Sequence, residues 1–466
     1  TPGFYYFDDK GEGGYILLRP ASDADYGNWH ELKFTLRVGL GTEYFIDGVA
    51  LGKTADADTT RLQETILNVY NFGSDYDVYW AGLKTAGSGP AKILGQVMIS
   101  ADGVTLQGLD ISKSGNYGVI TTKPVNKLSL LGNSIYDIGN VGGNIKGIYD
   151  SYGSDNVVID GNSIRNLNAT NRSADAINFG DSNTADPARN VTITNNLITN
   201  IQAIKGAYGI KLNSGAGVEN ALIQNNIINS LQGEWTHAVG LENKTPGAKV
   251  LGNIFSKLSS SGVDSVAVFF EANPDAAAVE VAGNQFAPGF LGIASHHNYS
   301  PWPLLDGRNN YWGAATGPVM GQYAGDVLVS PWCANPECTE FGRFPVSMDG
   351  SPRAYASIEE MMPFANDGDV IRVNAPITVG NPVVFSKAVK LACDPGVKLS
   401  VTTLAAGYST ANFTMQAEGS SIEGCIIEKT DKTGIDGIIR IAASGVKILN
   451  NKISGQEVEI TTPDST

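Results

Sequence analysis

The chain has 466 residues, 17% of them charged, with a formal net charge of −15 at pH 7. This length accommodates two or three domains. Its 55 glycines and 6 methionines are typical of a β-rich extracellular protein. A surface this acidic repels nucleic acid and anionic membranes, so we exclude both as partners. The chain has no apolar run of 18 residues, so we predict no membrane span.

The N-terminal segment, residues 1–90, is predicted to be a partial β-sandwich. It contains YGNWHELKFTLRVGLGTEYFIDGVALG and, further on, ETILNVYNFGSDYDVYWAGLK, where alternating strands surround a tight turn in FIDGV. These phrases are similar to laminin-G/concanavalin-like lectin domains, of which about half the usual length is present. We expect the missing strands to come from upstream or from another chain, because open strand edges invite pairing. The first residues, TPGFYYFDDK, suggest a processed piece of a longer protein.

An asparagine-marked repeat dominates residues 91–332. Copies such as VVIDGNSI, VTITNNLI and ALIQNNII place asparagine at the sixth position, and only the first copy, VTLQGLDI, departs from this with Leu109. The repeated asparagines are Asn133, Asn162, Asn196, Asn226, Asn253, Asn284 and Asn310, with Asn451 in a later copy. A period near 30 predicts one coil per repeat of a parallel β-solenoid. Coils stacked about 4.8 Å apart would align these amides into an asparagine ladder inside the coil.

A second apolar strand is predicted in each coil. It occurs as KGIYD, DAINF, YGIKL, HAVGLE and VAVFFE between the asparagine segments. We expect its Ile, Val, Leu and Phe side chains to alternate inward while the intervening residues face out.

The segment RNNYWGAATGP (308–318), followed by SPW (330–332), is similar to the closing coil of surface-located right-handed β-helix proteins. Residues 91–332 thus resemble the pectin-lyase-like superfamily. This resemblance implies a right-handed parallel β-helix but little about activity. The superfamily includes polysaccharide lyases, glycoside hydrolases, epimerases, phage tailspikes and adhesins.

The C-terminal part is predicted to be a linker over 333–353 and the start of a second β-helix over 354–466. The helix-like SIEEMMPFA would cap the first coil and GDVIRV would be its first strand. Cys393 and Cys425 both occupy the sixth, ladder, position, and adjacent coils bring such Cα atoms within disulfide range. Cys333 and Cys338 could close a small loop. Free thiols are the alternative, but the register favours two disulfides and an oxidising location.

Glu242 and Glu271 form the best candidate catalytic pair. Each closes the second strand of successive coils, so their side chains would stand about 5 Å apart on one face. This spacing suits a retaining glycosidase or a shared cation site, and one pKa would be raised by the other carboxylate. The alternative is that both are ordinary solvated strand residues.

Several residues are candidates for ligand binding beside this pair. Trp235 could stack on a sugar, and the polar candidates are His237, Lys211, Asn213, Asp150 and Asp181. Calcium is plausible in the acidic loops DADYGN (23–28), TADADTT (54–60) and GDSNTAD (180–186), but none has the EF-hand spacing, so an acidic turn is the favoured explanation of each.

Three functions follow from these patterns. The first is a secreted or cell-surface structural and adhesive protein, part of a larger surface protein, fibre or surface layer, that contacts glycans. The second is a carbohydrate-active enzyme, a glycoside hydrolase or polysaccharide lyase, working on the solenoid face. The third, glycan binding without turnover, lies between them. We favour the first, with neighbouring copies or a longer chain as further partners.

Overall fold

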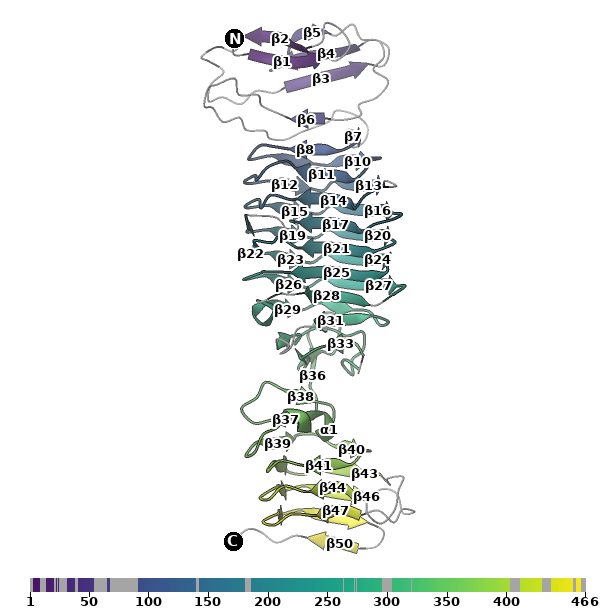
Figure 1. Ribbon diagram of the computed structural model, residues 1–466, viewed down its shortest axis with the longest axis vertical. Helices are drawn as coiled ribbons and strands as arrows, with labels where there is room; N and C mark the ends of the chain where they lie inside the picture. The colour runs from purple at the N-terminus through teal and green to yellow at the C-terminus, as the bar shows by residue number, and fades with distance from the viewer. Residues whose placement is uncertain are drawn as a thin grey trace.

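A computed structural model describes residues 3–8, 14–20, 22, 24, 32–37, 41–53, 65–67, 91–139, 142–180, 186–262, 264–271, 273, 275–295, 304–319, 321–402, 411–429, 437–455 and 458–461. Figure 1 shows an elongated molecule in which the coils of a parallel β-solenoid are stacked along the long axis, with β1 and β50 at opposite ends. The predicted all-β solenoid is confirmed.

The described N-terminal strands form small antiparallel sheets. β1 (Gly3–Asp8) pairs with β2 (Gly14–Pro20), and β4 (Gly41–Ile46) lies between β3 (Leu32–Arg37) and β5 (Val49–Lys53). Asp47 and Gly48, at the predicted FIDGV turn, have φ of 50° and 78°, as a two-residue hairpin turn requires. β6 (Thr65–Leu67), which we placed in the sandwich, instead pairs parallel with β8 of the solenoid.

Three parallel sheets form the walls of the first solenoid. The seven-stranded sheet comprises β9 (Thr105–Gln107), β12 (Ser129–Leu131), β15 (Val158–Asp160), β19 (Thr192–Thr194), β23 (Leu222–Gln224), β26 (Lys249–Leu251) and β29 (Glu280–Ala282). The eight-stranded sheet comprises β7 (Ala91–Leu94), β10 (Leu109–Ser112), β13 (Ser134–Ile138), β16 (Ser163–Ala169), β20 (Leu197–Ala203), β24 (Ile227–Gly233), β27 (Ile254–Ser260) and β30 (Gln285–Phe286). The ten-stranded sheet adds to β6 the strands β8 (Val97–Ile99), β11 (Tyr117–Thr121), β14 (Ile145–Asp150), β17 (Ala174–Phe179), β21 (Gly206–Leu212), β25 (Trp235–Glu242), β28 (Ser265–Glu271), β31 (Leu291–Ser295) and β33 (Tyr323–Ala324).

Short elements fill the turns of the first solenoid. They are β18 (Ala188–Arg189), β22 (Val218–Glu219), β32 (Leu305–Asp306), β34 (Val327–Leu328), β35 (Trp332–Cys333), β36 (Phe341–Gly342) and the 3-10 turn Ala276–Ala278. Each coil runs from the seven-stranded sheet to the eight-stranded and then the ten-stranded sheet. The interior is one apolar core, built from aligned aliphatic residues such as Ile193, Ile228 and Val239, which are fully buried. Burying one such side chain contributes roughly 1.5–3 kcal/mol.

The repeated asparagines lie at the corner between the first two sheets. Asn225, for example, has φ of 55°, and Asn226 follows it with a fully buried side chain. From Asn133 to Asn310 each amide Nδ2 donates to Oδ1 of the asparagine one coil further on, at 2.9 to 3.0 Å. The same oxygen also accepts the previous asparagine's backbone N–H, as between Asn196 and Asn226. These side chains therefore satisfy backbone groups that a sharp corner leaves without a sheet partner.

The strands of the ten-stranded sheet depart from the strict alternation that we predicted. A column of small residues runs through the sheet at one register: Gly118, Gly147, Ala176, Gly209, Ala238, Ala267 and Gly292. In β25, Ala238 and the following Val239 both belong to the apolar core. A Cβ added at Gly209 would lie 2.5 Å from the Ala238 carbonyl oxygen, so bulky residues are excluded there. Two consecutive inward residues leave the residues on either side of them on the outer face.

The second solenoid has its own three sheets and core. Its first sheet comprises β37 (Val346–Met348), β38 (Ala354–Tyr355), β39 (Val370–Val373), β42 (Lys390–Cys393), β45 (Ser421–Glu423) and β48 (Lys447–Leu449). The second comprises β40 (Ile377–Val379), β43 (Lys398–Val401), β46 (Ile426–Lys429), β49 (Lys452–Gly455) and β50 (Val458–Thr461), and the third β41 (Val383–Phe385), β44 (Ala411–Met415) and β47 (Gly437–Ile441). The predicted capping helix is present as α1 (Ile358–Met361), with Ser357 as its N-cap, followed by a 3-10 turn, Met362–Phe364.

Both predicted disulfides are present, Cys393–Cys425 and Cys333–Cys338. Cys425 also donates its backbone N–H to Oδ1 of Asn451 at 2.9 Å, the same contact that links asparagines of the first solenoid. Cys393, Cys425 and Asn451 thus occupy one column, in which a covalent bond replaces an amide contact.

The segment 333–353, for which we expected a linker, joins the two solenoids through strands. β36 pairs with β35, and β37 pairs with β39 of the second solenoid. Phe344 packs in the first apolar core and Val346 in the second. The cores are therefore separated by a single residue.

Candidate functional site

Glu242 and Glu271 lie on adjacent strands, and their Cα atoms are direct partners in the pairing of β25 with β28. The predicted register of this pair is therefore present. Their environments differ, because Glu242 is 7% exposed whereas Glu271 is half-buried. Two carboxyl groups with different surroundings on one face can hold their protons differently at one pH.

Lys211 on β21 is the nearest cation to Glu242. Its Nζ lies 3.2 Å from Glu242 Oε2 and 4.2 Å from the ring centroid of Tyr208. Burial nevertheless raises the pKa of Glu242 to about 7, since loss of water outweighs the attraction of Lys211, and the negative charge of Glu271 adds to the rise. Glu242 is therefore able to exchange a proton near neutral pH.

Tyr208 and Trp235 form the aromatic part of this face. The Trp235 indole Nε1 donates to the Tyr208 hydroxyl at 3.1 Å. The indole lies over Gly206, where an added Cβ would be 2.3 Å from Nε1. Burial, and then the negative charge of Glu242, raise the pKa of the Tyr208 hydroxyl, so it stays protonated. Trp235 is half-buried, so part of its ring remains available for contact.

His237 lies between two aromatic rings on the outer face. Its ring stacks on Phe269 at a centroid distance of 3.9 Å and meets Tyr208 edge-on at 5.2 Å. Phe269 belongs to a small apolar cluster with Val266 and Ala294 that is separate from the main core. The outer face is thus apolar around β28 and β31 and polar around β17, β21 and β25.

Three buried oxygen atoms on the polar part have no hydrogen-bond donor among the residues that the structure describes. They are Asp175 Oδ1, Asn178 Oδ1 and Glu242 Oε1. Asn178 Nδ2 does donate to the other Asp175 oxygen at 2.7 Å. Gly240 lies between them and the rings, because a Cβ there would be 3.2 Å from the Tyr208 ring and 3.7 Å from Glu242 Oε1. Buried acceptors without donors are costly unless a ligand or water supplies the donor.

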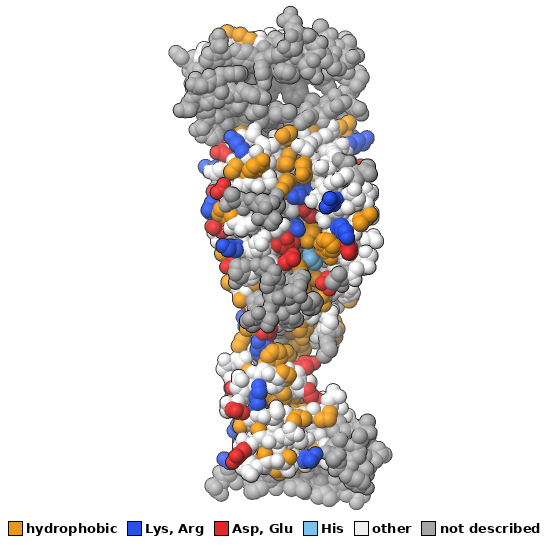
Figure 2. Space-filling view, in the orientation of Figure 1, with side chains coloured by type: hydrophobic (Ala, Val, Ile, Leu, Met, Phe, Trp, Pro, Cys, Tyr) orange, Lys and Arg blue, Asp and Glu red, His pale blue; other side chains and the backbone are white. Residues whose placement is uncertain are grey.

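We call this set of side chains the outer-face cluster. It consists of Asp175, Asn178, Tyr208, Lys211, Trp235, His237, Glu242, Phe269 and Glu271. Figure 2 shows acidic, basic, apolar and histidine side chains meeting midway along the first solenoid on the face in view.

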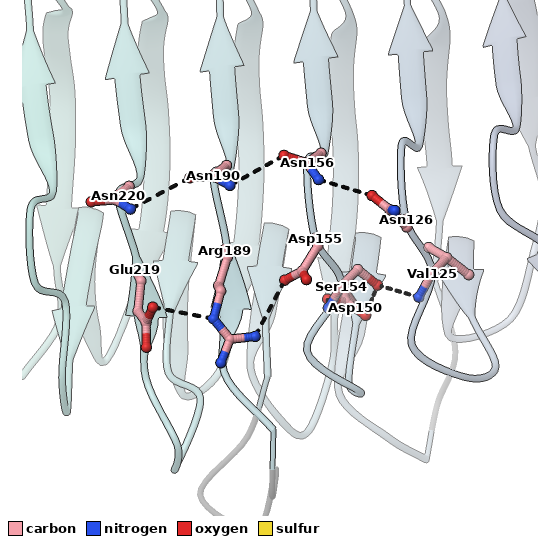
Figure 3. Close-up of polar contacts among 10 residues, drawn as sticks. All are labelled: Val125, Asn126, Asp150, Ser154, Asp155, Asn156, Arg189, Asn190, Glu219 and Asn220. Atoms are coloured by element: carbon pink, nitrogen blue, oxygen red, sulfur yellow. Dashed lines mark hydrogen bonds and ion pairs between the residues drawn. The ribbon is translucent and has the colours of Figure 1, made fainter.

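The remaining predicted binding residues lie elsewhere or next to the cluster. Asn213 is half-buried beside it and accepts a hydrogen bond from Asn243 Nδ2 at 2.9 Å. Asp150 lies on β14, three strands before β25, and its carboxylate accepts from Thr121 Oγ1 at 2.6 Å and from the Ser154 backbone N–H at 2.8 Å. Figure 3 shows Asp150 beside Ser154. Because a turn uses its oxygens, we do not retain Asp150 as a binding residue. Asp181 lies outside the described residues.

Sequence reasoning missed Asp175, Asn178, Tyr208 and Phe269. In strict alternation, every second residue of a strand faces out. At the small-residue column two consecutive residues face in, so the residues on either side of them, such as Asp175 and Asn178, face out. The available signal was the recurring small residue followed by an aliphatic one in DAINF, YGIKL and HAVGLE.

Two further expectations concern ions and membranes. The acidic loops considered for calcium lie almost entirely outside the described residues, and within the described part no group of three His, Cys, Asp or Glu side chains could hold a metal ion. Over the same residues, no helix has the length and apolarity needed to cross a bilayer.

The chain was compared with protein-family models and with curated protein sequences, and nothing in either comparison matches it. The parallel solenoid is therefore established by the structure alone, and the pectin-lyase-like and lectin-like resemblances stay predictions.

Proposed function

We propose that this protein is an extracellular or cell-surface adhesive β-solenoid that binds glycans through the outer-face cluster. The observation that carries this proposal is the set of three buried oxygens that have no donor among the described residues, Asp175 Oδ1, Asn178 Oδ1 and Glu242 Oε1. A saccharide offers many hydroxyl donors on a partly apolar ring, and the cluster supplies acceptors next to aromatic side chains.

Charge and cysteine chemistry support the same proposal. The net charge of −15 disfavours polyanionic glycans, so a neutral or amino sugar is the expected ligand class. Two disulfides are compatible with an oxidising, extracellular location. A solenoid with its site on one wall also presents that site to a long polymer lying across several coils.

Removal of the Lys211–Glu242 pair tests the proposal. The variant Lys211→Met with Glu242→Gln keeps side-chain volume but removes both charges, and we expect its affinity for a bound glycan to fall at least tenfold on a glycan array followed by calorimetry. The matched control is Lys249→Met with Glu280→Gln, an exposed pair at 2.9 Å between β26 and β29, which should leave affinity unchanged. Equal affinity of both variants and the unaltered chain would refute binding at the cluster.

A second candidate function is glycoside hydrolysis at Glu242 and Glu271. It is favoured by the pKa of Glu242 near 7 and by a second carboxyl group on the adjacent strand, because neighbouring strands lie about 4.8 Å apart and retaining enzymes separate their carboxyl groups by about 5 Å. Glu242 would protonate the leaving oxygen and Glu271 would attack the sugar. Release of reducing ends that Glu242→Gln abolishes while binding persists would establish this function. Binding without release across the same glycans would leave the adhesive function.

A further inference from the structure

A second polar groove lies at a corner of the first solenoid, away from the outer-face cluster. It lies along the C-terminal halves of β13, β16 and β20 of the eight-stranded sheet, and it has a volume of about 360 Å³. Pockets for small ligands have volumes of roughly 300–1,000 Å³. Its lining residues are Asp137, Ile138, Gly139, Asn166, Leu167, Asn168, Asn200 and Gln202.

One wall of this groove is a row of residues within these strands whose backbone adopts the left-handed conformation. Asp137, Asn166 and Asn200 have φ of 53°, 56° and 55°. Asn200 Nδ2 donates to Asn166 Oδ1 at 2.7 Å, and Asn166 Nδ2 donates to Asp137 Oδ1 at 3.0 Å. Both asparagines of the row therefore donate in the direction of the Asp137 carboxylate. Gln202 Nε2, from the same coil as Asn200, donates to Asn200 Oδ1 at 3.0 Å.

A row of this kind does not by itself indicate a ligand. Figure 3 shows a comparable row at another corner, where Asn156, Asn190 and Asn220 each donate to the asparagine one coil before, at 2.9, 3.1 and 3.4 Å. Stacked left-handed turns make such contacts as part of the fold. The groove needs further features to be a site.

The groove has a second row of side chains parallel to the first. Asn168 and Gln202 are partners in the pairing of β16 with β20, and both are exposed. Ile138, Leu167 and Ile201 lie between the two rows and are buried in the core, so the side chains of both rows face outward. Gly139 is in register with Asn168 one coil before, so it adds no side chain to this second row.

The two rows offer more hydrogen-bonding groups than the fold uses. Each amide has two N–H donors and an oxygen with two lone pairs, and the contacts above occupy one N–H each of Asn166, Asn200 and Gln202. Sugar hydroxyls both donate and accept, which matches alternating amide donors and acceptors along a groove. Asp137 is the only ionisable residue among the eight that line the groove, so an anionic sugar meets a like charge there.

We propose that this groove is a second saccharide-binding site, which takes a neutral oligosaccharide lying along the solenoid axis. Asn166, Asn168, Asn200 and Gln202 supply the contacts, and Asp137 excludes uronic acids. The site does not depend on the outer-face cluster or on any catalysis there.

The test uses the full chain and hexasaccharides of β-1,4-glucose, β-1,4-N-acetylglucosamine and α-1,4-glucose, with hexagalacturonate as the anionic probe, by titration calorimetry. Asn168→Ala with Gln202→Ala should weaken binding of a neutral hexasaccharide at least tenfold. The matched control is Gln232→Ala with Ser259→Ala, which changes the same column one and two coils further on, outside the groove. It should change affinity less than twofold.

Two further measurements separate this site from the outer-face cluster and from a folding defect. In a Lys211→Met, Glu242→Gln background, which removes binding at the outer-face cluster, the groove should still bind the neutral hexasaccharide, and loss of all binding in that background would assign the ligand to the outer-face cluster and overturn the proposal. Asn168→Ala alone, whose side chain makes no hydrogen bond within the described part of the chain, should weaken binding without moving the melting temperature. Absence of binding to all three neutral probes, tighter binding of hexagalacturonate, or equal affinity of groove and control variants would each overturn the proposal.

Discussion

At the scale of the residue, the same amino acid serves two purposes in this molecule. Buried asparagines such as Asn226 satisfy backbone groups inside the coil, whereas exposed ones such as Asn220 stabilise left-handed turns on its surface. The difference in burial decides the energetic consequence, because an unpaired polar group costs free energy only where water cannot reach it.

We therefore predict unequal effects of removing these two side chains from one coil. Asn226→Ala deprives Asn196 of an acceptor and Asn253 of a donor, and should lower the free energy of unfolding by about 2–4 kcal/mol in urea titrations. Asn220→Gly removes an exposed amide at φ of 54°, a conformation that glycine adopts freely, and should cost less than about 1 kcal/mol. Similar losses for the two variants would contradict the role of burial.

A pH dependence follows from Glu242. Its pKa rises from 4.5 to about 7 on folding, so the folded state holds this proton more tightly than the unfolded chain does. The stabilisation is fully present below pH 4.5 and is lost as the pH rises through 7, by up to about 1.4 kcal/mol per pH unit. Denaturant titrations of Glu242→Gln between pH 4.5 and 7 should show a flatter pH dependence, whereas Glu280→Gln, at an exposed site, should keep the original slope.

At the scale of the element, one column position accepts either an amide or a covalent bond. The Cys393–Cys425 disulfide lies where an asparagine pair would stand, and it closes a segment with a sequence separation of 32 residues, against 5 for Cys333–Cys338. A longer closed loop restricts the unfolded chain more strongly.

Substitution of the two disulfides should reveal this difference. Cys393→Ala with Cys425→Ala should destabilise the second solenoid by about 4 kcal/mol. The equivalent change at Cys333 and Cys338 should destabilise the first solenoid by about 2 kcal/mol. Cys393→Asn with Cys425→Asn should recover part of the loss, because Asn451 already presents its oxygen to residue 425. Calorimetric melting of the second solenoid measures the two Cys393/Cys425 variants, and melting of the first solenoid measures the Cys333/Cys338 variant. No recovery with asparagine would contradict the shared column.

Much of the fold was predictable because stacking repeats one environment in every coil. Asparagine at a constant register, with cysteine substituting at residues 393 and 425, indicated both the solenoid and its long-loop disulfide. The outer-face cluster was predictable only in part. Glu242 and Glu271 close their strands in register, but Tyr208 and Asp175 face out because the strands bend at a small residue, and a period of two contains no such bend.

At the scale of the whole molecule, two solenoids with separate cores are joined by a short segment and a polar contact. The Arg353 guanidinium donates to both carboxylate oxygens of Asp326 and to the Tyr355 hydroxyl at 3.1 Å, and it lies 4.3 Å from the Phe364 ring centroid. Both charged side chains are mostly buried, at 16% and 23% exposure. A partly buried ion pair of this kind stabilises the folded state more than a solvated pair does.

A double-mutant cycle should measure this contact. Arg353→Met and Asp326→Asn are expected to show a coupling free energy of about 1–2 kcal/mol, because each charge loses its partner in a partly dry site. The control cycle uses Arg372→Met and Asp349→Asn, a pair exposed by 41% and 48%, for which we expect less than about 0.5 kcal/mol. Equal coupling in the two cycles would show that Arg353 contributes no more than a surface contact.

The number of residues per coil varies while the asparagine contacts stay constant. Consecutive members of the ladder are 29, 34, 30, 27, 31 and 26 residues apart in the chain, yet each pair is joined by the same bond. Differences in coil length of up to eight residues therefore leave the stacking of the asparagines unchanged. A solenoid of this kind can gain or exchange side loops over evolutionary time without a change in how its coils stack.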